Sequence, residues 1–287
     1  MFEGQPDEVR HALQAVMRER RGPIKPLVGE LIFENPYFQM TRTSFQFETP
    51  GGAKFRYNLG EHLSLEMPDA ALEAECALYK WGTVYGAVAW LNRLPVLHAS
   101  CMTDGISASA ITAQSGVGKS TLAAAMGALG LRQICDDTLV LSEADGRSYA
   151  VPDLKPAKLS KEVIKYLGLA AGDEVPFSEG KRYVLPTKLE NDCVPLTNLV
   201  ELERGDELRI SPIVGSKKLE LIATSFYRPF IHSALHDSTY HSKLMLDLAQ
   251  RLACYRMTIP SDLSAITDYA AKLKEWLELK DNAKLQI

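Results

Sequence analysis

The chain has 287 residues, of which 46% are hydrophobic and 24% charged, and its formal net charge is -4 at neutral pH. This composition is that of a globular protein with one large domain or two small ones, either of which can bury a core. The slightly acidic balance gives no global field that would attract nucleic acid or an acidic membrane, so we expect neither as a partner.

The cysteines are odd in number, widely separated and without a CxxC pair, which favours a reducing compartment. No run approaches the roughly 18 continuous apolar residues of a membrane span, and the first residues lack the apolar core of a secretory signal. We therefore expect a cytoplasmic protein.

The N-terminal part combines a helical pattern with strand patterns. Residues 7–20 have the spacing of a short amphipathic helix that ends at the breaker RGPIKP. Residues 37–67 alternate apolar and polar side chains around the turn Pro50-Gly51-Gly52, which predicts antiparallel strands. We expect a β-rich α+β subdomain over residues 1–80.

From about residue 80 the pattern alternates helices and strands, which predicts an α/β domain over residues 81–287. Residues 145–163 have the prolines and charges of an excursion over the surface. Residues 196–204 and 208–214 predict strands, arranged as a hairpin around Gly205-Asp206. From Lys217 the chain is expected to be helical to the end, with a break at residues 259–261.

The segment AQSGVGKS, residues 113–120, matches the Walker A pattern except that Ala113 replaces the first glycine. Glycine lets successive N–H groups turn inward onto phosphate oxygens. Lys119 would place a charge near the β- and γ-phosphates of ATP, and the Ser120 hydroxyl would bind Mg²⁺. The residues predicted to bind ATP are Ser115, Gly116, Val117, Gly118, Lys119, Ser120 and Thr121.

The surroundings of this loop suit a phosphate site. The apolar run ISASAITA predicts a strand before it, and an alanine-rich helix from Lys119 to about Leu129 follows it. That helix would direct its positive N-terminal end at the phosphates. The alternative is a glycine turn that joins a strand to a helix and binds no ligand.

Asp136 and Asp137 close the short apolar strand LRQIC. A right-handed β-α-β crossover would bring them to the edge of the sheet where the loop lies. One carboxylate could then hold Mg²⁺ while the other accepts a proton from an acceptor hydroxyl, which favours a kinase. Side chains of neighbouring strand residues point to opposite faces, so both acids reach one site only if the chain turns there. A plain turn or a helix N-cap is the alternative.

Four histidines are further candidates for a functional site. His98 precedes the strand that feeds the loop, so it lies either beside the γ-phosphate or at an ordinary strand end. His232, His236 and His241, with Asp237, suggest a metal site by their spacing, but no further ligand set is evident. We favour a polar helix surface for them.

Residues 94–141 resemble the catalytic domain of the HPr kinase/phosphorylase family, and the resemblance extends more weakly over about 80–270. It rests on a histidine-bearing strand, a short turn, an SGxGKS loop and a DD pair that closes the next strand. It implies an α/β P-loop kinase core of HPr-kinase type with a smaller N-terminal β-rich subdomain and a helical C-terminal part. It also implies catalytic roles for His98, Lys119, Asp136 and Asp137, with Ser120 and Asp136 on Mg²⁺ and Asp137 as the base for a serine hydroxyl.

The chain departs from the bifunctional enzymes of that family. It has Thr121 where they have glutamate, His98-Ala99-Ser100 where they have His-Gly-Thr, and no arginine- and glycine-rich signature soon after the aspartates. These departures speak against the reverse phosphorylase reaction and against HPr as the substrate. The motifs HAS, GKST, DD, NLVELER and YRP are closer to shorter HPr-kinase-like proteins, some of which phosphorylate a serine of a lasso-peptide precursor.

The leading hypothesis is therefore a kinase that uses ATP and Mg²⁺ to phosphorylate a serine of a peptide or protein. Residues 1–80 would help to hold the acceptor. Lys155, Lys158, Lys181 and Arg182 either grip the acceptor or phosphates or are solvated surface charges. An HPr-type phosphocarrier kinase, a nucleotide-binding regulator and a small-molecule kinase are the alternatives. Members of the family often form hexamers, so the resemblance allows for a homo-oligomer.

Overall fold

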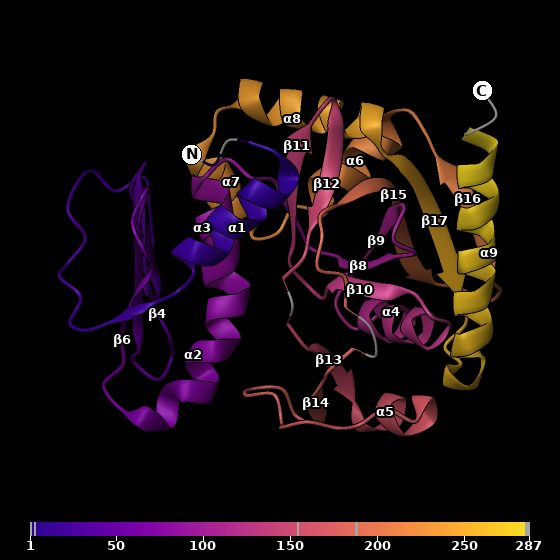
Figure 1. Ribbon diagram of the computed structural model, residues 1–287, viewed down its shortest axis with the longest axis horizontal. Helices are drawn as coiled ribbons and strands as arrows, with labels where there is room; N and C mark the ends of the chain where they lie inside the picture. Colours follow the sequence, from indigo (N-terminus) through magenta and orange to yellow (C-terminus); the bar gives the residue numbers. More distant parts are fainter. Residues whose placement is uncertain (1, 3, 154, 187–188, 285–287) are drawn as a thin grey trace.

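The computed structural model describes residues 2, 4–153, 155–186 and 189–284 (Figure 1). It is a mixed α/β structure in which a smaller N-terminal sheet and a larger sheet lie on either side of a helical segment. No described helix is both long and apolar enough to cross a lipid bilayer.

The described residues from 20 to 66 form a six-stranded sheet in the order β1-β6-β5-β4-β3-β2. The central pairings are antiparallel, as the alternation over residues 37–67 predicts. Its buried side chains are largely aromatic, and Phe38 stacks on Phe45 at 5.3 Å between ring centroids. The strands are β1 (Arg20–Arg21), β2 (Phe33–Asn35), β3 (Phe38–Met40), β4 (Ser44–Glu48), β5 (Lys54–Asn58) and β6 (Ser64–Glu66).

A continuous helical segment separates the two sheets. It consists of α2 (Glu73–Tyr79), a π-helical turn (Lys80–Val84) and α3 (Tyr85–Leu91), while α1 (Pro6–Val16) packs beside β11 and β12. Every residue of α3 is buried. One cluster of buried side chains runs from the N-terminal sheet through α3 into the larger sheet. The division of the chain at residue 80 stays a prediction.

Within the described part of the chain, nine strands form the larger sheet, with the path β10-β8-β9-β15-β12-β11-β7 and with β17 and β16 joined to β15. The N-terminal end of β15 pairs with β12, and the rest of the same edge pairs with β17. The strands are β7 (Val96–Leu97), β8 (Ser100–Thr103), β9 (Ala108–Ala113), β10 (Arg132–Cys135), β11 (Leu139–Ala144), β12 (Arg147–Val151), β15 (Val194–Arg204), β16 (Arg209–Ile213) and β17 (Ala253–Ile259).

The order of three strands explains how distant residues meet. β9 leads into the glycine loop, α4 (Lys119–Ala128) follows, and the chain returns along β10. β8 lies between β9 and β10 and is antiparallel to both. β9 and β10 therefore point the same way, and their C-terminal ends share one edge of the sheet with the N-terminal end of β8.

Two predictions for the C-terminal half are wrong. Residues 253–259 are not helical: they form β17, which pairs in parallel with β15 and buries Met257 and Ile259. β15 and β16 do not form a hairpin, because β17 lies between them. The helices of this half are α6 (Ser216–Thr224), α7 (Pro229–Leu235), α8 (Ser238–Arg251) and α9 (Ile266–Lys284), and α9 packs against α4.

The expected surface excursion over residues 145–163 is also wrong. β12 lies inside the sheet between β11 and β15, with Ala150 and Val151 buried. The charges that suggested exposure neutralise each other in the interior, since Lys155 Nζ lies 3.0 Å from Asp153 Oδ2 and both residues are buried. Beyond them, β13 (Ala157–Ser160) pairs with β14 (Lys181–Val184), and α5 (Lys161–Leu167) follows β13.

Candidate active site

The glycine loop has the backbone that the motif requires. Gly116 and Gly118 have φ values of 85° and 117°, in the region that side-chain-bearing residues rarely adopt. Gly118 is the N-cap of α4, and no described side chain caps that helix end by a hydrogen bond. The first N–H groups of α4 thus lie at a helix terminus suited to a phosphate group.

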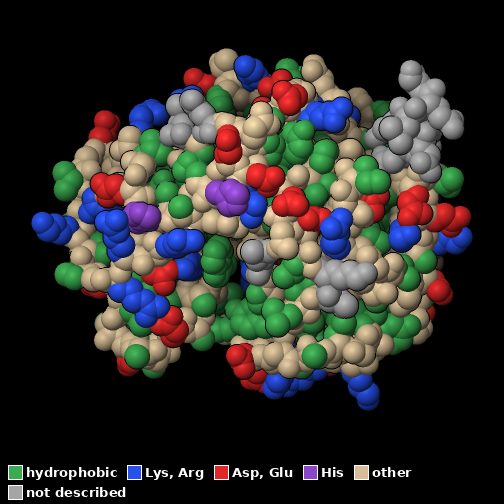
Figure 2. Space-filling view, viewed as in Figure 1, with side chains coloured by type: hydrophobic (Ala, Val, Ile, Leu, Met, Phe, Trp, Pro, Cys, Tyr) green, Lys and Arg blue, Asp and Glu red, His purple; other side chains and the backbone are tan. Residues whose placement is uncertain are grey.

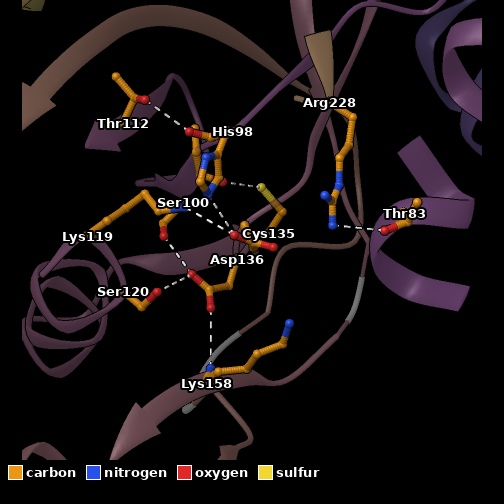
Figure 3. A network of polar contacts seen from close by, with 12 residues as sticks. Thr83, His98, Ser100, Thr112, Lys119, Ser120, Cys135, Asp136, Lys158 and Arg228 are labelled. Carbon is orange, nitrogen blue, oxygen red and sulfur yellow. Dashed lines mark hydrogen bonds and ion pairs between the residues drawn. The ribbon is translucent and has the colours of Figure 1, made fainter. Parts of the chain in front are cut away.

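Asp136 is buried at the end of β10, where it joins three segments of the chain (Figure 3). Its Oδ1 atom accepts hydrogen bonds from Ser120 Oγ at 2.8 Å and from Ser100 Oγ at 2.6 Å. Its Oδ2 atom accepts a bond from the backbone N–H of Lys158 at 3.3 Å. Ser100 reaches Asp136 because β8 begins at the edge where β10 ends.

Asp137 turns to the same site. Its φ of 79° breaks the extended conformation, so its carboxylate does not point to the opposite face of the sheet from that of Asp136. The Oδ1 atom lies 2.9 Å from His98 Nε2 and 3.5 Å from Lys119 Nζ. The turn that the sequence required of the two acids is present.

The surroundings of Asp137 favour its ionised form. Burial alone would raise the pKa of this carboxyl, but the hydrogen bond from His98 and the charges of Lys119 and Lys155 outweigh burial and lower the pKa well below its usual range. Asp137 is therefore a carboxylate at neutral pH.

The backbone of His98 is held on both sides. Its N–H donates to Ser225 O at 2.6 Å, and its carbonyl accepts a bond from Thr112 Oγ1 at 3.0 Å. The ring meets Tyr227 edge to face, with 6.0 Å between centroids. These contacts fix the imidazole between the loop-bearing strand β9 and the segment that precedes α7.

The oxygen atoms around Asp136 fit Mg²⁺. Ser120 Oγ and Asp136 Oδ1 are hard donors 2.8 Å apart, at the start of α4 and beside the glycine loop. Mg²⁺ usually takes one or two protein ligands and completes its shell with phosphate oxygens and water. Among the described residues there is no group of three or more His, Cys, Asp or Glu side chains that could hold a metal ion by themselves.

The four basic residues that followed the aspartates in the sequence have different environments. Lys155 is buried, and its Nζ atom forms an ion pair with Asp153 and donates a hydrogen bond to the carbonyl of Trp81 in the π-helical turn. Burial lowers the pKa of Lys158, which lies close to both aspartates. Lys181 is exposed on β14, and Arg182 pairs with Glu174 at 3.3 Å. The hypothesis of four solvated charges therefore fails for Lys155.

Two arginines lie near the site although their sequence positions predicted no functional role for them. Arg228, in the motif YRP, lies with its guanidinium 5.6 Å from the centre of the Tyr227 ring and donates to Thr83 Oγ1 at 3.1 Å. Arg204 ends β15, and its guanidinium lies against Gly118 of the loop. Only long-range strand pairing brings Arg204 here, and the motif YRP was the one available signal for Arg228.

A cleft of about 880 Å³ opens beside the glycine loop. Its walls include Gln114, Ser115 and Val117 of the loop, together with His98 and Arg204. This volume lies within the usual range for small-molecule and cofactor sites.

The histidine cluster is not a polar helix surface. His232 is buried and lies between Trp90 and Phe226, with ring centroids 4.6 and 5.1 Å away. Its Nδ1 atom is 3.2 Å from His241 Nδ1. Burial lowers the pKa of His232 and of His236 to about 4, so both are neutral at pH 7 and pack with aromatic rings.

No protein-family model and no curated protein sequence matches the chain. Among solved structures, the HPr(Ser) kinase/phosphatase from Coxiella burnetii aligns with 66% of this chain and 96% of its own, at 13% sequence identity and a TM-score of 0.33. A likeness this distant supports no function, and membership of that family stays a prediction.

Proposed function

We propose that the protein is a magnesium-dependent kinase that transfers the γ-phosphoryl group of ATP to a serine hydroxyl of a peptide or protein. The contact of Asp137 with both His98 and Lys119 carries the proposal, because it places a carboxylate beside the lysine of a phosphate-binding loop. A carboxylate in that position suits a base that acts on the attacking hydroxyl.

Each residue of the site has a separate role in the proposed transfer. The loop N–H groups and Lys119 hold the phosphates. Asp137 accepts the proton of the serine hydroxyl while the serine oxygen forms a bond to the γ-phosphorus. The bond from the γ-phosphorus to the β,γ-bridging oxygen breaks, and ADP leaves. His98 orients Asp137 through the 2.9 Å contact. Ser120 and Asp136 would hold Mg²⁺, which supplies charge neutralisation on the phosphates when it is bound.

The acceptor approaches from the side of α2 in this proposal. Figure 2 shows a hollow on this face, with hydrophobic side chains along it, between α2 and the β13–β14 pair. Phe177 and Leu185, next to β14, are 70% and 75% exposed, and the Phe177 ring lies 6.5 Å from that of Tyr79 at the end of α2. Exposed apolar side chains of this kind suit an extended peptide, and a lasso-peptide precursor is one such acceptor.

Incubation with γ-labelled ATP, Mg²⁺ and a set of serine peptides tests the proposal. We expect label on a peptide serine, with ADP formed in equal amount. ATP hydrolysis without a labelled peptide or protein would support a nucleotide-dependent regulator instead, and the absence of ATP binding would overturn the proposal.

A further inference from the structure

We propose that Arg204 binds the adenosine half of the nucleotide, with its guanidinium plane against the purine. This inference rests on the proposed binding of ATP at the glycine loop and names the residue that recognises the part of ATP beyond the phosphates.

The sheet brings Arg204 to the loop. β15 pairs in parallel with β9 through Leu202 and Ala113, and Arg204 lies two residues further along β15, beside the loop that leaves β9. Arg204 Nη2 lies 3.2 Å from the position that a β-carbon on Gly118 would occupy. A glycine at this position thus admits both the positive φ of the loop and the arginine that lies over it.

A second contact fixes the direction of the arginine. Arg204 Nη1 donates to the carbonyl of Pro260 at 2.9 Å, just beyond the end of β17. The guanidinium is therefore held between the loop and the ends of two parallel strands. Arg204 is otherwise exposed, so a ligand has access to it.

The order of the strands sets the direction of the nucleotide. The sheet runs β10-β8-β9-β15, with β17 beyond, so the acids that follow β10 and the arginine that ends β15 lie on opposite sides of the loop strand β9. A nucleotide whose γ-phosphate faces Asp137 must extend its nucleoside away from β10. That direction leads to Arg204, which lines the cleft beside the loop together with Val117.

The chemistry of the side chain suits a purine. A guanidinium is planar and delocalised, and it stacks on aromatic faces more readily than an ammonium does because it is more weakly hydrated. The bond to Pro260 uses one N–H group of the guanidinium, and because Arg204 is exposed, a face of the group stays open for a base to stack on.

Titration calorimetry with two probes tests the assignment: ATP and inorganic tripolyphosphate, each with Mg²⁺. We expect R204A to weaken ATP binding by about tenfold while tripolyphosphate binding stays at the wild-type value. R204K should not restore ATP affinity, because an ammonium lacks the stacking plane. R209A is the matched control, an exposed arginine on β16 that should leave both affinities unchanged.

Three outcomes would overturn the assignment. An equal loss for both probes would make Arg204 a phosphate ligand, and no loss for either would remove it from the site. Restoration by R204K would reduce its role to charge. If the wild-type protein binds neither probe, the proposed function itself fails, and this result is separable from the others because it precedes any substitution. Circular dichroism of each variant checks its folding.

Discussion

The Nε2 atom of His98 lies 2.9 Å from the Oδ1 atom of Asp137, although 39 positions separate the two residues in sequence. Lys119 Nζ reaches the same carboxylate oxygen at 3.5 Å. The bend between β7 and β8 and the start of α4 thus meet at one carboxylate oxygen of Asp137, and the chemistry proposed for the site depends on the charge of that carboxylate.

We expect D137N to bind MgATP as the wild type does but to lose about 10²- to 10⁴-fold in kcat, since the amide cannot accept the serine proton. Calorimetry and the labelled-peptide assay measure the two effects separately. D145N is the matched control, because Asp145 also has a positive φ, 49°, but lies in the exposed turn between β11 and β12. Normal turnover by D137N would remove Asp137 from the base role.

The H98A variant should shift the acid limb of the pH profile. The hydrogen bond from His98 helps to lower the pKa of Asp137, so its loss raises that pKa and moves the fall in kcat to higher pH. We expect H98A to lose activity on acidification at a pH where the wild type retains it. A lower kcat with an unchanged pH profile would contradict this coupling.

Ser120 should set the requirement for Mg²⁺. S120A removes one of the two oxygen donors that lie 2.8 Å apart, so we expect the Mg²⁺ concentration for half-maximal activity to rise about tenfold or more. S120T keeps the hydroxyl and should retain most of the affinity. An unchanged Mg²⁺ dependence in S120A would place the ion elsewhere.

Breaking the buried ion pair of Asp153 and Lys155 should destabilise the fold. K155M leaves the Asp153 carboxyl buried without its cation, which we expect to lower the free energy of unfolding by about 3–5 kcal/mol. The double variant D153N/K155M removes both charges and should recover part of the loss. Urea unfolding of the three proteins measures the difference; a double variant less stable than K155M would contradict this explanation.

Stability should also depend on the buried histidines. Burial lowers the pKa of His232 and His236 to about 4, so between pH 6.5 and 4 the unfolded chain binds more protons than the folded one. The free energy of unfolding therefore falls as pH drops through this window, by up to about 1.4 kcal/mol per pH unit for each histidine.

The contribution of one histidine can be isolated by substitution. H232F fits between Trp90 and Phe226 and cannot titrate, so its unfolding free energy should fall less steeply on acidification than that of the wild type. H11Q alters an exposed histidine and should leave the slope unchanged. Burial raises the pKa of Asp153 to about 6, so below pH 6 this group opposes the fall in the unfolding free energy. Its effect is the same in the wild type, H232F and H11Q. Parallel slopes for H232F and wild type would contradict the prediction.

Local pattern was enough to find the loop and the acids. A strand, a glycine turn and a helix are contiguous, so spacing alone predicts how Gly116, Gly118 and Lys119 lie, and the crossover rule brings the acids to the same edge. The sequence showed that a turn at Asp137 is needed for both acids to reach one site, but it could not predict that the turn forms, because the turn depends on contacts with His98 and Lys119.

Partners that come from distant parts of the chain could not be found in this way. β17 follows a helix, and its alternation of apolar and polar residues is too short to distinguish a strand from a further helix. Only the parallel pairing with β15 makes this segment a strand. The position of Arg204 could not be predicted for the same reason, because its place beside Gly118 depends on the register between β15 and β9. Lysine side chains are rarely buried unless they are paired, so the sequence favoured an exposed Lys155. The structure buries it together with its partner Asp153.

The single buried cluster that joins both sheets has a consequence for how such a molecule can diverge. Because α3 belongs to the same buried cluster as side chains of both sheets, the N-terminal sheet cannot be exchanged for an unrelated one without uncovering part of that cluster. Changes on the N-terminal side would therefore have to come from single substitutions at its surface, in small steps that keep the shared interior intact.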